Sequence, residues 1–225
     1  SLNQQYSLSL SGGGAKVNYY LSGGFDKNND NLIRNGLNRI TINSNLNYHL
    51  SSSFDLSSNI VFSESDQAVN NIGSDQITSG NGKVIYPYAS IADKKGNPLS
   101  IVKDYNTDYI NQAQSNGLLD WSYDPLADMR DANSHVKTND IRINTSARYH
   151  IDSLFSIEGR YQYERQNVNS RNLQSEALYY TRNLINQYTY MNPDSTLSYP
   201  IPKGAILDNS VLTTISHAAR LQVNL

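Results

Sequence analysis

The sequence predicts an all-β protein, an antiparallel up-and-down meander of about seven long strands that forms an open section of a larger transmembrane β-barrel. Apolar and polar residues alternate with a period of two along several stretches, as they do in strands with one apolar face. Short turns alternate with longer polar connections between these stretches. Alternate connections of a meander lie on opposite rims, so the long loops share one rim, as extracellular loops of outer-membrane barrels do.

The hairpin from Val136 to Gln166 shows this alternation most clearly. Odd positions are apolar or small from Ile141 to Ile151, the even positions between them are polar, and the pattern restarts at Phe155. Each strand runs for more than ten residues. This length exceeds the roughly five or six residues of a typical strand and reaches the about 9–11 that a tilted strand needs to cross a bilayer. The hairpin is therefore predicted to span a membrane.

The same parity predicts the register of this hairpin. Ile151 and Phe155 must share a face, so the turn between them should have three residues. In this register, residues of unlike charge face each other across the two strands, and so do two apolar residues. Such cross-strand pairs favour strand pairing. The predicted pairs are Arg148 with Glu158, Arg142 with Glu164, and Ile143 with Tyr163.

Five further strands are predicted from the same pattern. Their expected ranges are 5–11, 17–25, 37–50, 54–62 and 210–225, with a polar connection at 26–36. The run Gly12-Gly13-Gly14 is expected to supply the positive φ angles of a tight turn. Residues 51–53, three serines, are expected to form a three-residue turn that places His49 opposite Asp55.

Two long excursions, at about residues 66–135 and 167–209, interrupt the alternation and are the predicted extracellular loops. They contain all six prolines and the only tryptophan, and a short helix is expected within 171–187. Flat aromatic rings in polar surroundings stack on sugars or anchor protein partners. The alternative is that they pack the loop against itself, because an ordered loop of this length needs a small core. The candidate contact residues are Tyr86, Tyr88, Tyr105, Tyr109, Trp121 and Tyr123.

Composition limits the possible classes of protein. No apolar run approaches the about 18–20 residues of a transmembrane helix, which excludes a helical membrane protein. The net charge is −2 with dispersed basic residues, so no nucleic-acid partner is expected. The absence of cysteine excludes disulfides and thiolate metal sites. The chain starts without a basic and apolar leader, so any signal sequence is expected to lie outside it.

The residues provide little support for catalysis. Glu158 and Glu164 share a face, but six strand residues of about 3.3 Å each place them roughly 20 Å apart, beyond the about 5–9.5 Å of a glycosidase pair. Ser216-His217 lies within a predicted strand and lacks the glycines of a nucleophile elbow. No enzyme activity, catalytic residue or cofactor is expected.

A metal site is not expected either. The four histidines do not occur at the spacing of metal ligands. Asp26, Asn28 and Asp30 copy the first three ligand positions of a calcium loop, but Asn31 and Leu37 stand where such a loop has its glycine and its bidentate glutamate.

Several phrases of the chain together resemble one protein family, the SusC/RagA family of TonB-dependent outer-membrane transporters. The resemblance extends through nearly the whole chain. The phrases are 86–89 (YPYA), 92–99 (ADKKGNPL), 103–105 (KDY), 118–126 (LLDWSYDPL), 179–186 (YYTRNLIN), 201–208 (IPKGAILD) and, in the second strand, 22–25 (SGGF).

This resemblance implies that the protein belongs to Bacteroidota-type bacteria and imports glycan or peptide fragments through the outer membrane. It implies a SusD-like lipoprotein partner, contact with membrane lipid, and energy delivered by TonB through a plug domain that lies outside residues 1–225. The chain would then be a partial barrel domain. The predicted strand number agrees, because seven strands are odd and too few, whereas bacterial barrels have even numbers from about 8 upward.

In such a barrel, the charged residues on the polar face of the central hairpin would face the lumen. They could line the transport path or hold the plug, and these two roles stay open. Two other functions also stay open: a soluble secreted β domain that binds carbohydrate, and a passive porin or adhesin barrel. The predicted lumen-facing charges are Arg142, Arg148, Glu158, Arg160 and Glu164.

Overall fold

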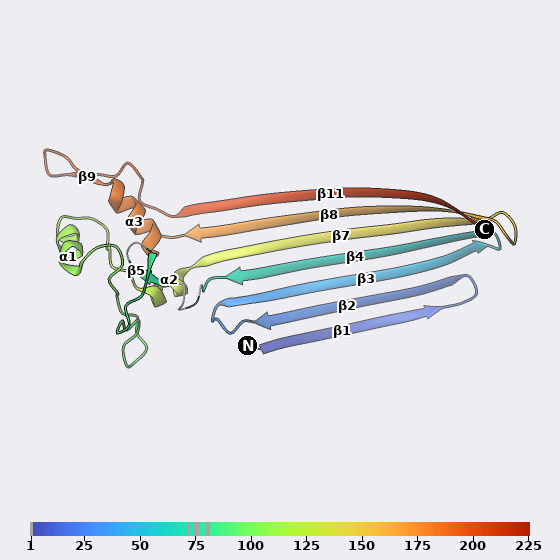
Figure 1. Ribbon diagram of the computed structural model, residues 1–225, viewed down its shortest axis with the longest axis horizontal. Coiled ribbons are helices and arrows are strands. Elements are labelled where there is room, and N and C mark those ends of the chain that lie inside the picture. Colours follow the sequence, from blue (N-terminus) through green and yellow to red (C-terminus); the bar gives the residue numbers. More distant parts are fainter. Residues whose placement is uncertain (1, 72, 74–76, 80–81) are drawn as a thin grey trace.

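The computed structural model describes residues 2–71, 73, 77–79 and 82–225. Within this part, the fold is all-β, with one seven-stranded antiparallel sheet in which the strands follow one another in chain order (Figure 1). Strands β1 and β11 form the two edges of this open sheet. The strands are β1 (Leu2–Gly13), β2 (Val17–Asn29), β3 (Asn35–Ser51), β4 (Phe54–Val69), β7 (Asn133–His150), β8 (Ser156–Gln174) and β11 (Ile206–Asn224).

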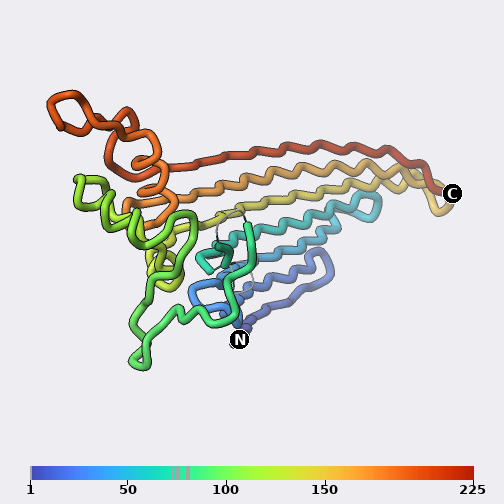
Figure 2. The backbone as a smooth tube through the Cα atoms, turned by 60° about the vertical axis from the view of Figure 1, so that its left-hand side comes forward, coloured from blue at the N-terminus to red at the C-terminus, as the bar shows by residue number. Residues whose placement is uncertain are grey.

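The short turns and the long loops lie at opposite ends of the sheet, as predicted. Figures 1 and 2 show the two long loops together at one end, beyond the ends of β4, β7, β8 and β11. These loops contain the helices α1 (Thr107–Ser115), α2 (Pro125–Asp131) and α3 (Tyr179–Tyr188), and the short strands β5 (Thr78–Ser79), β6 (Lys83–Val84), β9 (Tyr190–Met191) and β10 (Leu197–Ser198). In the described ranges, no helix is both long and apolar enough to cross a membrane.

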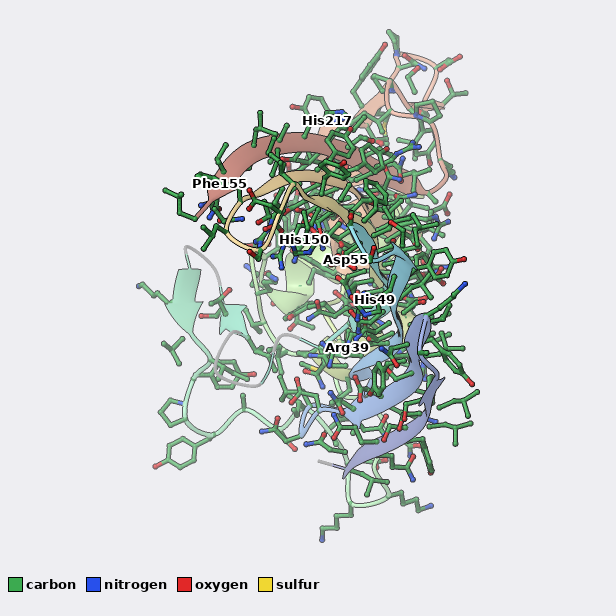
Figure 3. All side chains as sticks on the ribbon, turned by 90° about the vertical axis from the view of Figure 1, so that its right-hand side faces the viewer. Arg39, His49, Asp55, His150, Phe155 and His217 are labelled. Atoms are coloured by element: carbon green, nitrogen blue, oxygen red, sulfur yellow. The ribbon has the colours of Figure 1, made fainter. Side chains whose placement is uncertain are left out.

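The sheet is curved, and its two faces differ in polarity. Figure 3 shows Arg39, His49, Asp55 and His150 on the inside of the curve and His217 on the outside. We call these sides the concave face and the convex face. Because alternate residues of a strand point to opposite faces, the register places the apolar series on the convex face. Neighbouring residues there include Ile42, Phe62 and Ile141 in one row, and Ile60, Ile143 and Tyr163 in the next.

The predicted register of the central hairpin is confirmed. Arg148 pairs with Glu158, Arg142 with Glu164 and Ile143 with Tyr163. The turn has the predicted three residues, since Ile151 N donates to Phe155 O at 2.9 Å. Asp152 stabilises this turn, because its Oδ1 accepts hydrogen bonds from Leu154 N at 2.7 Å and Phe155 N at 2.8 Å.

Two predictions about turns are wrong in detail. His49 does pair with Asp55, but Ser51 pairs with Phe54, and a register shift lies between His49 and Ser51. The turn therefore has two residues, and an extra residue in β3 restores the predicted register, as in a β-bulge.

The run Gly12-Gly13-Gly14 also does not supply positive φ angles, because its first two glycines lie within β1 and none of the three has a positive φ. Close approach explains Gly12 and Gly13 instead, whereas a Cβ at Gly14 would meet nothing within 4 Å. A Cβ at Gly12 would lie 2.6 Å from the Tyr19 hydroxyl, and one at Gly13 would lie 2.7 Å from Val17 O.

The strands are longer and the connections shorter than predicted. The long loops cover 70–132 and 175–205 instead of about 66–135 and 167–209, and the connection predicted at 26–36 covers only 30–34. The alternation fades in the added strand segments because both faces are polar there, but the backbone pairing continues. The helix expected within 171–187 is present as α3, while α1 and α2 were not predicted. Residues 72, 74–76 and 80–81 of the first predicted loop lie outside the described residues.

Candidate functional site

The five predicted lumen charges lie together on the concave face, in two groups. Arg142 Nη2 lies 2.7 Å from Glu164 Oε1. Glu158 lies between two arginines, with Oε2 at 2.9 Å from Arg148 Nη2 and Oε1 at 2.5 Å from Arg160 Nε. Glu158 is only 4% exposed, so its carboxylate is held by these guanidinium groups and not by water.

A second charged cluster on this face lies near the short turns. Asp55 accepts from two imidazoles, with its Oδ1 at 2.6 Å from His49 Nδ1 and its Oδ2 at 3.0 Å from His150 Nε2 (Figure 3). Sequence reasoning placed His49 opposite Asp55 but missed His150. The strand register contains the signal that would have identified His150. Asp55 pairs with Arg148, and His150 lies two residues further along β7, on the same face and diagonally across from Asp55.

Between the Arg142–Glu164 pair and the Arg148–Glu158 pair, polar side chains form a network that sequence reasoning also missed. Asn59 Nδ2 donates to Asn43 Oδ1 at 3.0 Å and to Asn45 Oδ1 at 2.7 Å, and its own Oδ1 accepts from Asn144 Nδ2 at 3.1 Å. The signal was the asparagines at every second position of the third predicted strand. A hollow of about 540 Å³ lies over this network. Concave-face residues that line it are Asn45, Asn47, Ser57, Asn59, Asn144, Ser146, Arg160, Gln162, Ala218 and Arg220.

The two long loops pack against each other as one unit, which we call the loop unit (residues 77–79, 82–132 and 175–205). Tyr105 packs on Trp121, with 4.5 Å between ring centroids, and Tyr123 packs on Tyr179 of the second loop at 5.2 Å. Lys103 Nζ lies 4.0 Å from the centroid of the Tyr123 ring. The buried core of the unit consists of Ile77, Ile101, Ala113, Trp121, Tyr123 and Tyr179.

Hydrogen bonds from α3 hold the first loop in place. Asn186 is 2% exposed and makes two bonds to one residue, since its Oδ1 accepts from Leu119 N and its Nδ2 donates to Leu119 O, both at 2.9 Å. Trp121 Nε1 donates to Asn183 Oδ1 at 2.8 Å. Arg182 donates to Asp120 O at 2.7 Å and to the carbonyl oxygen of residue 122 at 3.0 Å.

These contacts divide the six candidate contact aromatics. Trp121 and Tyr123 are 3% and 6% exposed, and Tyr105 is packed against the same core, so these three rings stabilise the loop unit. Tyr88 is 97% exposed, and Tyr86 keeps 43% of its surface exposed, so these two remain available for contact. Tyr109 is 46% exposed, but one side of its ring packs on Tyr105, with 5.2 Å between ring centroids. Sequence reasoning missed further exposed aromatics on the second loop, which are Tyr180, Tyr188 and Tyr190.

Burial also changes the acid–base behaviour of the loop unit. Burial, assisted by the nearby Asp128 carboxylate, raises the pKa of Tyr123 to about 12. Burial and the hydrogen bond that its hydroxyl donates to Asp104 at 2.6 Å raise the pKa of Tyr179 as well. Burial likewise raises the pKa of the Asp128 carboxyl above its usual range, against the hydrogen bond that Asp128 Oδ1 accepts from Tyr179 N.

The charged groups and the asparagine network described above give the concave face carboxylates, guanidinium groups and amides, which are groups that can bind polar ligands. Among the described residues, no group of three or more His, Asp or Glu side chains is placed to hold a metal ion. In the His49–Asp55–His150 cluster, one nitrogen of each imidazole contacts the Asp55 carboxylate, and both carboxylate oxygens are used by these two contacts.

The fold is similar to that of chains in two solved structures, titled "Structure of the RagAB peptide importer in the 'closed-closed' state" and "Structure of the RagAB peptide transporter". Both matches have a TM-score of 0.56 and 14% sequence identity, and they cover 75% and 76% of this chain. The chain spans 18% of the length of each matched chain. No family model matches the sequence, and no curated protein matches it.

We predict that Asn186→Ala will loosen the loop unit and leave the sheet intact. The change removes both bonds to buried Leu119 groups, which should cost about 2–3 kcal/mol of local stability. Hydrogen exchange measured by mass spectrometry should show faster exchange in 107–131. Tyr188→Ala, at a position of the same helix that is 57% exposed, is the matched control. Equal protection in both variants would contradict the role of Asn186.

We also predict that the loop unit will loosen at alkaline pH. The pKa of Tyr123 is raised from its ordinary 10 to about 12, so the folded unit prefers the neutral phenol. This contribution to stability is complete below pH 10 and is lost as the pH rises toward 12. Ultraviolet titration curves are measured for the wild type and for Tyr123→Phe, and the second curve is subtracted from the first. The difference should show one phenol that ionises near pH 12. A difference curve centred at the ordinary value would show that Tyr123 is not buried in solution.

Proposed function

We propose that this chain is a wall segment of an outer-membrane β-barrel of the SusC/RagA type. The full-length protein that contains it would import peptide or glycan fragments with energy delivered through TonB. A SusD-like lipoprotein is the proposed partner at the rim of the long loops, and TonB acts through a plug region outside this chain. The fold likeness to the RagAB peptide importer supports peptide as the first substrate class to test. The proposed activity is binding and gated passage, without bond chemistry or a cofactor.

One arrangement carries this proposal: an apolar band on the convex face lies behind a mainly polar concave face. On β4 and β7 the band runs from Phe54 to Phe62 and from Ile141 to Tyr149, about nine residues in each strand, close to the roughly 9–11 of a bilayer-crossing strand. At about 3.3 Å per residue and a tilt of about 40°, such a strand rises roughly 23 Å, which matches the roughly 25 Å apolar band of outer-membrane barrels.

Both limits of the band support this placement in a membrane. Toward the long loops, the next convex row is polar on β4, β7 and β8, because Glu64 pairs with Asn139, and Asn139 with Asn167. Toward the short turns, the band ends in aromatic residues, as expected where a barrel meets the lipid head groups. These aromatic residues are Tyr48, Phe54 and Tyr149.

The segments beyond the band support the same orientation. β7 and β8 continue past it as paired strands from Asn133 to Asp140 and from Gln166 to Leu173. Polar residues predominate on both faces there, which suits water and not lipid. The loop unit then sits above this extension, as the proposed lipoprotein contact requires.

The two alternative functions agree less well with this arrangement. A soluble β domain would need a second layer over the convex face, whose residues Leu8, Tyr161 and Leu221 are 80%, 47% and 77% exposed. A passive barrel would agree with the band as well as an importer does. The fold likeness to the RagAB chains favours the importer.

We predict that a charge in the middle of the band will destabilise the protein in a depth-dependent way. Ile143→Arg should cost about 2–4 kcal/mol, while Asn139→Arg, on the same face beyond the polar edge of the band, should cost less than about 1 kcal/mol. Urea unfolding of the full-length protein in lipid vesicles measures the free energy of unfolding of both variants. If the full-length protein stays folded and monomeric without lipid or detergent, the proposed membrane wall is wrong.

Transport itself is tested with the full-length protein in its native outer membrane. Uptake of fluorescent oligopeptides should fall to the background level when TonB is deleted, because the proposed passage needs energy. A fluorescent oligosaccharide of similar size tests the glycan alternative in parallel. Uptake that continues without TonB would identify a passive barrel.

A further inference from the structure

The hollow on the concave face is formed by two neighbouring rows of side chains that run across the sheet. Amides dominate one row, with Asn59 opposite Asn144, while Arg160 and Arg220 lie in the other. Small residues, Ser57, Ser146 and Ala218, leave the space between the larger groups. The volume of about 540 Å³ lies within the about 300–1,000 Å³ of ligand pockets.

The positive charge beside this hollow exceeds the negative charge. Both carboxylate oxygens of Glu158 are used, one by Arg148 and the other by Arg160. Arg220 lies directly opposite Arg160 and has no ion-pair partner in the described part of the chain. Like charges in directly opposite positions destabilise a strand pair. Three guanidinium groups thus face two carboxylates, because Asp55 lies opposite Arg148, and both oxygens of Asp55 already contact imidazoles.

The hydrogen-bond inventory points the same way. Arg148 Nε is buried and has no hydrogen-bond partner among the described atoms, so Glu158 does not satisfy even the guanidinium groups that it contacts. Asn59 gives its own amide hydrogens to Asn43 and Asn45, so the amide row is held in place before any ligand arrives. Planar guanidinium groups bind carboxylates through paired hydrogen bonds.

We propose that this hollow binds a carboxylate group between Arg220 and Arg160. The inference rests on the proposed importer function, because it places the hollow on the lumen side of a barrel wall. The carboxylate has two possible sources, a transported acidic peptide or a segment of the same protein outside this chain. In either case, the bound carboxylate balances positive charge of Arg160 and Arg220 that Glu158 does not compensate.

The test uses the purified full-length protein in detergent and two synthetic pentapeptides that differ only in glutamate versus glutamine at two positions. Isothermal titration calorimetry measures their affinity for the wild type, Arg220→Gln, Arg220→Lys and Arg171→Gln. Arg171 is the matched control, because it lies on the opposite face of β8, near the loop end of the strand. A photo-crosslinking amino acid in place of Ala218, which lines the hollow, identifies what occupies it.

If the peptide supplies the carboxylate, Arg220→Gln should weaken binding of the glutamate peptide about tenfold, as loss of one charge-assisted hydrogen bond predicts. The glutamine peptide should be unaffected, Arg220→Lys should keep part of the affinity, and Arg171→Gln should change nothing. If the protein supplies the carboxylate, the crosslink should instead join residue 218 to an acidic segment of the same polypeptide, and Arg220→Gln should abolish it. The proposal is overturned if Arg220→Gln alters neither the peptide preference nor the crosslink.

These outcomes are separable from the fate of the proposed function. Uptake that does not depend on TonB would remove the importer but leave a carboxylate site in the hollow. Conversely, TonB-dependent uptake together with an Arg220→Gln variant that matches the wild type in both assays would keep the importer and remove the site.

Discussion

Uninterrupted backbone pairing between long neighbouring strands is the constraint on which the rest of this structure depends. β8 and β11 pair residue by residue from the first residue of β8 to its last, and β7 and β8 do so over the whole of β7. Because alternate residues point to opposite faces, unbroken pairing keeps each residue on the same side of the sheet throughout. A single layer can therefore be apolar on one face and polar on the other.

The charge arrangement of the concave face follows from the same pairing. A shift of one residue in the central hairpin would move Glu158 to the convex face, among the apolar side chains, and would leave Arg148 without its partner. The three-residue turn, which Asp152 stabilises, prevents that shift. The positions of the charges on the concave face thus depend on local turn geometry near the opposite end of the strands from the loop unit.

The loop unit is stabilised differently, by a small core of its own. Its two loops are far apart in the sequence, and α3 joins them by burying Tyr179 and by bonding Asn186 to Leu119. Such an arrangement gives a defined surface at the loop rim, where Tyr88 and the aromatics of the second loop stay exposed. Tyrosines of one loop therefore differ in burial: Tyr123 packs in the core, while Tyr88 remains accessible.

The sequence by itself determined the strands of the apolar band, their order, the faces of their residues and the register of the central hairpin. The faces and the register depend on parity, which can be read from neighbouring residues alone, and the order follows from the alternation of short turns and longer connections. Only the tertiary structure decided the strand ends beyond the band, where both faces are polar and the pairing itself is the only signal. It also decided the bulge after His49, the helices of the first loop, and the meeting of Arg220 with Arg160 beside the hollow. The Arg220–Arg160 pair comes from residues that are distant in the chain, and the bulge and the helices are local departures from the strand pattern. A pattern with a period of two contains no information about either.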